Sequence, residues 1–190
     1  ILSVMSLGAF RAYSIAKREA ELLRNVTLAF EMIRRDLVGS VYKDPATGNA
    51  IAGVNFLGID QTDAGGKADD KLRFFALLSP DSSARADLTS VNYKREESGG
   101  VKRLARASLE TGPSGLPPLL LDGVETFEPL HFYVTAFDVT YLSSPAGSFQ
   151  ASYDASSAGR LPRAARIRLS VQIPGGKEKT FTYTVNLAME

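Results

Sequence analysis

Residues 17–38, KREAELLRNVTLAFEMIRRDLV, decide the fold class. At 100° per residue, the apolar side chains of this stretch fall in one stripe about 120° wide, and most of the charged ones lie on the other side. This pattern is typical of an amphipathic helix docked on a sheet, since burial of each large apolar side chain contributes about 1.5–3 kcal/mol. The stripe includes Leu23 and Ala29, and the predicted helix-on-sheet core consists of Leu22, Val26, Phe30, Ile33 and Leu37.

The preceding residues, ILSVMSLGAFRAYSIA (1–16), carry a single charge, at Arg11. A bilayer-spanning helix needs about 20 predominantly apolar residues, so this segment is too short to span alone. It is either the end of a longer apolar segment that begins upstream or part of a buried helix, and we expect the former. Because no proline precedes Pro45, we predict one unbroken helix from near Ile1 to about Leu37, ended by Gly39 and the turn-rich segment 44–49.

After Ala50 the apolar period changes from 3.6 to 2, which indicates β-strands. Two hairpins are predicted, one within 89–107 and one that joins 165–173 to 179–187. The further strand candidates are KLRFFALL (71–78), with a run typical of burial on both faces, LLLDGVETF (119–127) and HFYVTAFDVTYL (131–142).

One long helix followed by about seven to nine strands predicts an α+β fold, with the helix packed on antiparallel sheet. We expect residues 1–40 to form the helix. Residues 1–16 would be its apolar part and residues 17–40 its amphipathic part. Residues 41–190 would form a β-rich head that makes one globular unit with the helix.

The composition is that of an ordinary globular domain. The chain has 190 residues, 44% of them hydrophobic, and a formal net charge of +1, so no global field steers it toward nucleic acid. The lack of cysteine excludes disulfides, iron–sulfur clusters, thiolate zinc sites and cysteine nucleophiles. No HExxH, GxGxxG or P-loop pattern is present, and no nucleophile elbow accompanies the one histidine, His131. We therefore predict neither enzyme activity nor a cofactor.

Two polar features have a functional and a simpler interpretation. The candidate calcium ligands are Asp60, Asp63, Asp69 and Asp70, because carboxylates on a loop are what calcium uses. Their spacing fits no EF-hand, and Asp and Gly are ordinary turn residues, so solvated turns are the favoured interpretation. Basic residues cluster in 160–168 and 94–106, where a charged strand face is favoured over a nucleic-acid site.

Leu28 and Met32 lie at i and i+4 on the side of the helix away from the apolar stripe. A monomer has nothing to bury them. They are either ordinary exposed apolar residues or contacts for a partner helix.

A helix that is apolar all round at its start, amphipathic from Lys17 and followed by antiparallel sheet resembles that of a type IV pilin or pseudopilin. FEMIRRDL (30–37), in which an acidic residue follows two arginines, is similar to the helix end of minor pseudopilins. The resemblance implies that residues 1–10 are the back half of a membrane-spanning, filament-core helix. The partner-helix contacts it predicts are Ile1, Leu2, Val4, Met5, Leu7, Phe10, Leu28 and Met32.

The order of sequence blocks resembles the J-type minor pseudopilin of type II secretion. The blocks are 70–77, 87–106, 119–127, 134–142, 161–173 and 181–187, and residues 128–133 separate the third block from the fourth. The resemblance implies a structural protein at the tip of a periplasmic pseudopilus, with minor pseudopilins of the H, I and K types as partners. It also implies a single-pass anchor in the bacterial inner membrane, a methylated N-terminus upstream of Ile1, and neither a nucleic acid nor a small-molecule substrate.

Two alternatives remain at the level of sequence. One is a W-type minor pilin of a type IV pilus, which would serve in priming, adhesion or DNA uptake. The other, more distant, is a periplasmic ligand-binding module or hydrolase, which would need a well-formed pocket with convergent polar groups.

Overall fold

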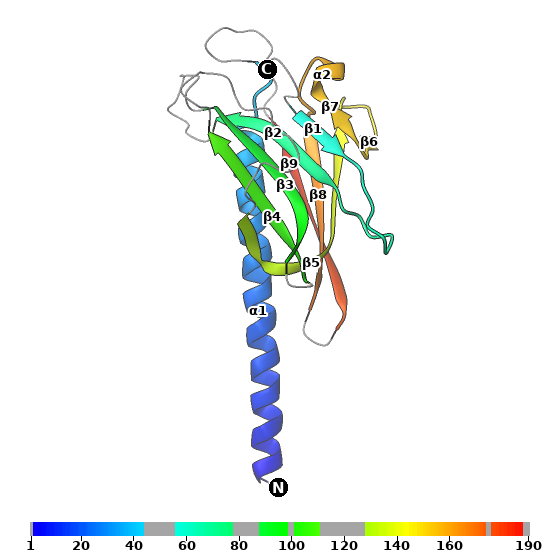
Figure 1. The fold of residues 1–190 in the computed structure, drawn as a ribbon. Coiled ribbons are helices and arrows are strands. Elements are labelled where there is room, and N and C mark those ends of the chain that lie inside the picture. Colours follow the sequence, from blue (N-terminus) through cyan, green and yellow to red (C-terminus); the bar gives the residue numbers. More distant parts are fainter. Residues whose placement is uncertain are drawn as a thin grey trace.

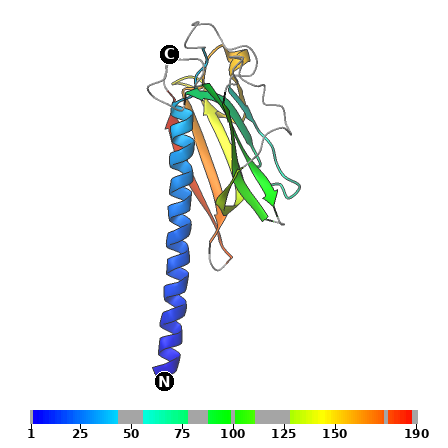
Figure 2. The ribbon, with the colours of Figure 1, turned by 60° about the vertical axis from the view of Figure 1, so that its left-hand side comes forward.

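A computed structural model describes residues 2–43, 56–77, 88–98, 101–110, 128–173 and 176–187. A single helix, α1 (Leu2–Val38), opens the chain, which confirms the predicted unbroken helix. Its C-terminal half lies against a large sheet, and its N-terminal half projects well beyond the sheet (Figures 1 and 2). The helix ends at Val38, and the absence of a side chain at Gly39 lets the chain pass close to β2, since a Cβ there would lie 2.6 Å from the carbonyl oxygen of Leu77.

The head is built on antiparallel strands, which confirms the α+β class. The strands are β1 (Phe56–Ile59), β2 (Lys71–Leu77), β3 (Leu88–Ser98), β4 (Val101–Glu110), β5 (Glu128–Leu142), β6 (Phe149–Gln150), β7 (Tyr153–Asp154), β8 (Ala164–Gln172) and β9 (Glu178–Asn186). Their order in the sheet is β7-β1-β2-β3-β4-β5-β8-β9, and β6 pairs with β5. A short helix, α2 (Ala155–Ala158), follows β7.

The strong strand predictions are confirmed, and the weaker ones need correction. Hairpins β3–β4 and β8–β9, and strands β2 and β5, lie where the alternating pattern placed them. Residues 128–133 are not a separate insertion; they begin β5, where Glu128 pairs with Arg106 and Tyr133 with Arg103 of β4. The candidate strand 119–127 lies outside the described residues. β1, β6 and β7 were not predicted, because strands of two to four residues carry too little periodic signal.

Two loop segments tie the β1 side of the sheet to β5, so the sheet curls back on itself. The first segment is residues 60–70. There the backbone amide of Asp70 donates to the carbonyl of Phe137 at 3.1 Å, and the amide of Phe137 donates to the carbonyl of Ala68 at 3.0 Å. The second segment joins β5 to β8 and contains β6, β7 and α2. In it, β6 pairs with the end of β5, and β7 pairs with Leu57 and Gly58 of β1. Neither segment has an alternating apolar pattern in the sequence, yet both complete the head.

The core fills the space between the curled sheet and α1. Its aromatic centre is formed by Phe56, Phe74, Tyr93, Tyr141 and Tyr153, with successive ring centroids 5.7–6.5 Å apart. Gly58 allows β1 to pass directly over Tyr141, because a Cβ on that glycine would lie 2.1 Å from the tyrosine ring.

The helix meets this core through the predicted stripe. Val26, Phe30, Ile33 and Leu37 are buried and Leu22 is partly buried against them. The exception is Leu23, which the stripe had included: it remains 37% exposed, since it lies about 80° from the centre of the buried face.

Strand β2 is buried on both faces, as its continuous apolar run predicted. Phe74 belongs to the main core. Phe75 packs on the opposite face with Val41 and Leu77.

Candidate partner-binding surface of helix α1

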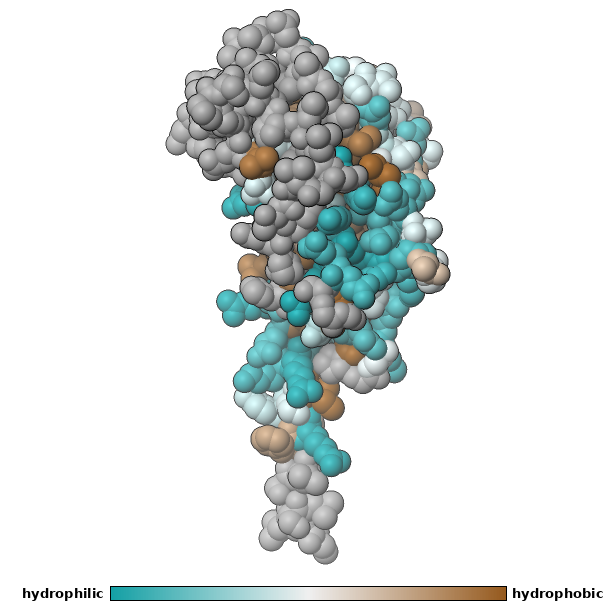
Figure 3. Space-filling model, in the orientation of Figure 1, coloured by the Kyte–Doolittle hydropathy of each residue, from teal (hydrophilic) through white to brown (hydrophobic). Residues whose placement is uncertain are grey.

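The projecting half of α1 presents large apolar side chains that no described residue covers. Phe10 is 69% exposed, Tyr13 67% and Ile15 52%. Figure 3 shows hydrophobic side chains among hydrophilic ones along the helix below the head. Single exposed apolar residues are common, but a series of them on one projecting helix is typical of a surface that packs against another protein.

The predicted contacts Phe10 and Leu28 lie on one line along the outside of α1. They are 18 residues apart, which is five full helical turns and about 27 Å. Leu28 is 56% exposed, and Met32, one turn further on, is half-buried. Leu2, Val4, Met5 and Leu7 belong to the same helix, and Ile1 lies outside the described residues.

Three charged residues interrupt this line between its apolar ends. Lys17, Glu21 and Arg24 are all exposed. None of them forms an ion pair or hydrogen bond with any residue that the structure describes. The outward face of α1 therefore has Phe10 at one end, three unpaired charges in the middle, and Leu28 with Met32 toward the head, where Arg35 also lies on this line beside Asp36.

The direction in which α1 leaves the head is held by a buried carboxylate. Asp36 is fully buried and accepts hydrogen bonds from the hydroxyl of Tyr93 at 2.6 Å and from Nε of Arg106 at 2.7 Å. The two donors face each other on neighbouring strands β3 and β4. The last turn of the helix is thus fixed to the middle of the sheet by a charged hydrogen-bond network.

The pKa values of both donors reflect this network. Burial, followed by the charge of Asp36, raises the pKa of Tyr93 well above 10, so the phenol stays a donor. Burial alone would lower the pKa of Arg106, but the hydrogen bond and charge of Asp36 outweigh it and the pKa is raised.

Asp36 was not among the residues predicted from the sequence. The available signal was its place beside Ile33 and Leu37, since a carboxylate next to an apolar stripe must find buried donors.

The aspartate-rich loop is used for structure within the head. Arg95, whose side chain is 1% exposed, donates to Asp63 and to Asp69, each at 2.9 Å. Lys102 also reaches Asp63, at 2.7 Å, and the other oxygen of Asp63 accepts from two backbone amides of its own loop. The hydrogen bond from Lys102, with those from the backbone and Arg95, holds the pKa of Asp63 well below its usual range.

Most of the carboxylates named as calcium candidates bind other groups of the head. Asp70 is buried and accepts from the backbone amides of Gln61 and Val139 at 3.1 and 2.7 Å, while Asp60 stands apart on the surface. Cationic side chains and amides therefore use the oxygen atoms that calcium would need. Within the described ranges, no group of three or more His, Cys, Asp or Glu residues could hold a metal ion.

The sequence profile of the family described as "Type II secretion system (T2SS), protein J" matches residues 5–182. The chain belongs to this family. Among solved structures, the chain is similar to a type IV-like pilin from Thermus thermophilus, with a TM-score of 0.53 and 13% sequence identity over 87% of this chain and 95% of that one. At this identity the likeness shows the fold, a long helix packed on an antiparallel sheet. A search of curated proteins found no match.

Membership in the T2SS protein J family identifies the chain as a minor pseudopilin, a structural component of type II secretion that interacts with other pseudopilins. The match favours type II secretion over the pilus alternative raised by the sequence. Proteins of the family are membrane-anchored and act in the periplasm. Among the described residues of this chain, no helix is both long enough and apolar enough to cross a membrane.

Several residues of the basic clusters of this T2SS protein J family member contact other side chains of the head. Arg168 pairs with Asp138, and the guanidinium of Arg166 lies 3.7 Å from the ring centroid of Phe149. In the hairpin, Arg95 and Arg106 are engaged by buried or half-buried aspartates. The clusters therefore serve the fold, which supports the interpretation as charged strand faces.

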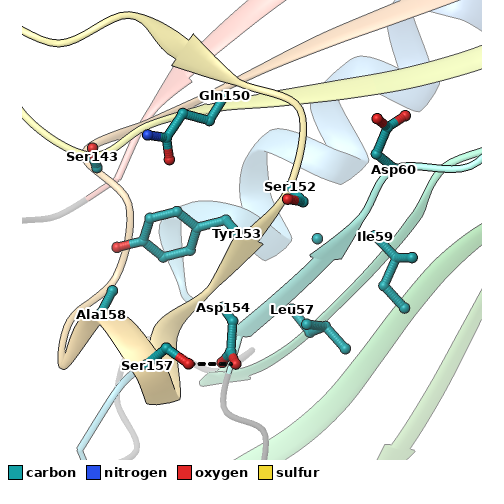
Figure 4. Close-up of a pocket in the computed structure, with 11 residues that line it drawn as sticks. Leu57, Ile59, Asp60, Ser143, Gln150, Ser152, Tyr153, Asp154, Ser157 and Ala158 are labelled. Carbon is teal, nitrogen blue, oxygen red and sulfur yellow. Dashed lines mark hydrogen bonds between the residues drawn. The ribbon is translucent and has the colours of Figure 1, made fainter.

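An open hollow of ≈ 620 Å³ lies between the two segments that close the sheet, lined by β1, β6, β7 and α2. Figure 4 shows that its polar groups do not converge on one point: Asp154 bonds with Ser157 at 3.0 Å, and Asp60 lies apart from that pair. Asp154 also accepts from the backbone of Ser156 and so caps α2. The arrangement stabilises the head and lacks the convergent groups of an enzyme site.

Proposed function

We propose that this minor pseudopilin assembles at the tip of the type II secretion pseudopilus with minor pseudopilins of the I, K and H types, and has no enzymatic role. It would help to initiate the filament and support protein export. A single-pass anchor upstream of the described helix would hold it in the bacterial inner membrane, with the head in the periplasm. The family match and the pilin-like fold support this proposal.

The observation that carries the proposal is the uncovered outward face of α1. The head buries the opposite stripe completely between Val26 and Leu37 and leaves Phe10 and Leu28 in solvent. Burying these side chains against a partner helix would contribute about 1.5–3 kcal/mol each. The partner contacts would thus come from a helix that the head holds in a fixed direction.

The test mixes the purified chain with candidate I- and K-type pseudopilins and follows the complex by size-exclusion chromatography. We expect co-elution at about 50 µM, for which a Kd of about 1 µM, equivalent to about 8.2 kcal/mol of binding free energy, is sufficient. Leu28→Glu with Met32→Glu should prevent co-elution while leaving the melting temperature nearly unchanged, since both side chains lie outside the core.

Two control variants sharpen this test. Ala20→Glu with Thr27→Glu adds the same two charges at exposed positions on a neighbouring face of the helix and should keep binding. Ile33→Ala should instead lower the free energy of unfolding by about 2–5 kcal/mol, because it truncates a fully buried side chain. Separate elution of the wild-type proteins at 50 µM would contradict the proposal.

A further inference from the structure

The outward face of α1 has a charged centre that any partner helix must cover. At 100° per residue, Lys17, Glu21 and Arg24 fall within about 40° of the line from Phe10 to Leu28. Lys17 and Arg24 are seven residues apart, or about 10 Å along the axis. A helix that contacts both apolar ends therefore passes directly over these charges.

The charges at this centre have no partner in the described chain. Neither cation pairs with Glu21, although both lie within one helical turn of it. An apolar partner would strip water from two cations without replacing it, which is unfavourable. An acidic partner would supply the missing hydrogen-bond acceptors, and the long stems of lysine and arginine can reach across to it.

We propose that the occupant of this face is a neighbouring amphipathic helix that places one acidic side chain opposite Lys17 and a second, seven residues away, opposite Arg24. This inference rests on the proposed function and adds the chemistry of the partner to it. The apolar ends would supply most of the affinity. The acidic pair would set the register and the choice of partner, as polar positions do in coiled coils.

The same charges argue against two other occupants. A second copy of this chain, aligned in parallel, would bring Lys17 against Lys17 and Arg24 against Arg24, so like charges oppose that pairing. Anionic membrane surfaces bind clusters of about four to eight basic residues, whereas this face has three cations, Lys17, Arg24 and Arg35, with a glutamate between the first two.

The experiment measures the Kd of the chain for purified I- and K-type pseudopilins by isothermal titration calorimetry, in about 50 and 500 mM salt. Lys17→Glu with Arg24→Glu should weaken binding about tenfold or more at low salt and remove most of its salt dependence. The matched control is Arg11→Glu with Arg18→Glu, which reverses two exposed cations that are also seven residues apart on another face. It should change the Kd less than about threefold.

A reciprocal change identifies the contact. Replacing the partner's acidic pair by lysines should restore binding to Lys17→Glu with Arg24→Glu. Equal weakening by the two charge reversals would overturn the inference, since it would show only a general charge effect.

The failure of the inference can be separated from the failure of the proposed function. If Leu28→Glu with Met32→Glu abolishes binding but the reversal of Lys17 and Arg24 does not, the helix face is used and the acidic pair is wrong. If neither variant affects binding, the face itself is not the interface. The inference is also overturned if the reversal acts instead on co-sedimentation with phosphatidylglycerol vesicles, or on self-association in sedimentation velocity.

Discussion

Replacing Asp36 by asparagine should destabilise the protein far more than any surface charge change. The asparagine keeps the size of the side chain and can still accept a hydrogen bond from Tyr93. It removes the negative charge beside Arg106, whose side chain is only 15% exposed. A buried cation is then left without its counterion, which is the costly way to break such a pair.

The magnitude follows from the burial of both partners. Removing one member of a fully buried ion pair costs about 3–5 kcal/mol, and the partial exposure of Arg106 reduces this to about 2–4 kcal/mol. A matched control is Glu31→Gln. Glu31 pairs with Arg34 at 2.9 Å on the surface of the same helix, with both side chains about half exposed, so its loss should cost less than about 1 kcal/mol.

Urea unfolding followed by circular dichroism measures the free energy of unfolding of both variants. A double-mutant cycle then isolates the interaction energy between Asp36 and Arg106. Arg106→Met alone should also be costly, because it leaves Asp36 buried with Tyr93 as its main donor. The double variant should cost less than the sum of the two, by about 1–3 kcal/mol. If Asp36→Asn costs no more than Glu31→Gln, or if the two changes are additive, the network does not anchor the helix.

Further predictions concern the closure of the sheet. Gly58→Ala should lower the free energy of unfolding by about 2 kcal/mol or more, because its Cβ would overlap a fully buried tyrosine ring. The control, Gly8→Ala in the open part of α1, should be neutral or stabilising. Similar losses of stability in both variants would contradict this prediction. Burial raises the pKa of Asp70 to about 6. Because the folded pKa lies above the unfolded one, this group's stabilisation is full below about pH 4 and is lost as the pH rises through 6. The melting temperature should therefore fall from pH 5 to pH 7 by a few degrees more in wild type than in Asp70→Asn, and parallel curves would refute the shift. Arg95→Met should speed hydrogen exchange in the loop 60–70 while that of β8 stays slow, and uniform acceleration would indicate global unfolding instead. Millimolar calcium should leave the melting temperature of wild type nearly unchanged, and a rise of many degrees would restore the loop as a metal site.

The elements with strong local patterns could be read from the sequence. The stripe from Leu22 to Leu37 predicted the helix and its buried face, and the alternation in 165–173 and 179–187 predicted the last hairpin. Helical and strand periods are properties of neighbouring residues, so they do not depend on the rest of the fold. The same reasoning recognised Leu28 as exposed, because its position relative to the stripe follows from helix geometry alone.

The parts that depend on distant partners were decided only by the tertiary structure. Asp36 meets donors that lie 57 and 70 positions away, and Arg95 meets Asp63 across 32 positions. Strands as short as β1, β6 and β7 exist because other strands offer them backbone partners, and their own residues carry almost no periodic signal. The sequence thus determined which faces are apolar. The three-dimensional arrangement determined which charges are buried, which are paired and which are left for a partner, because a charge in a folded protein is stabilised by the groups that the fold brings next to it.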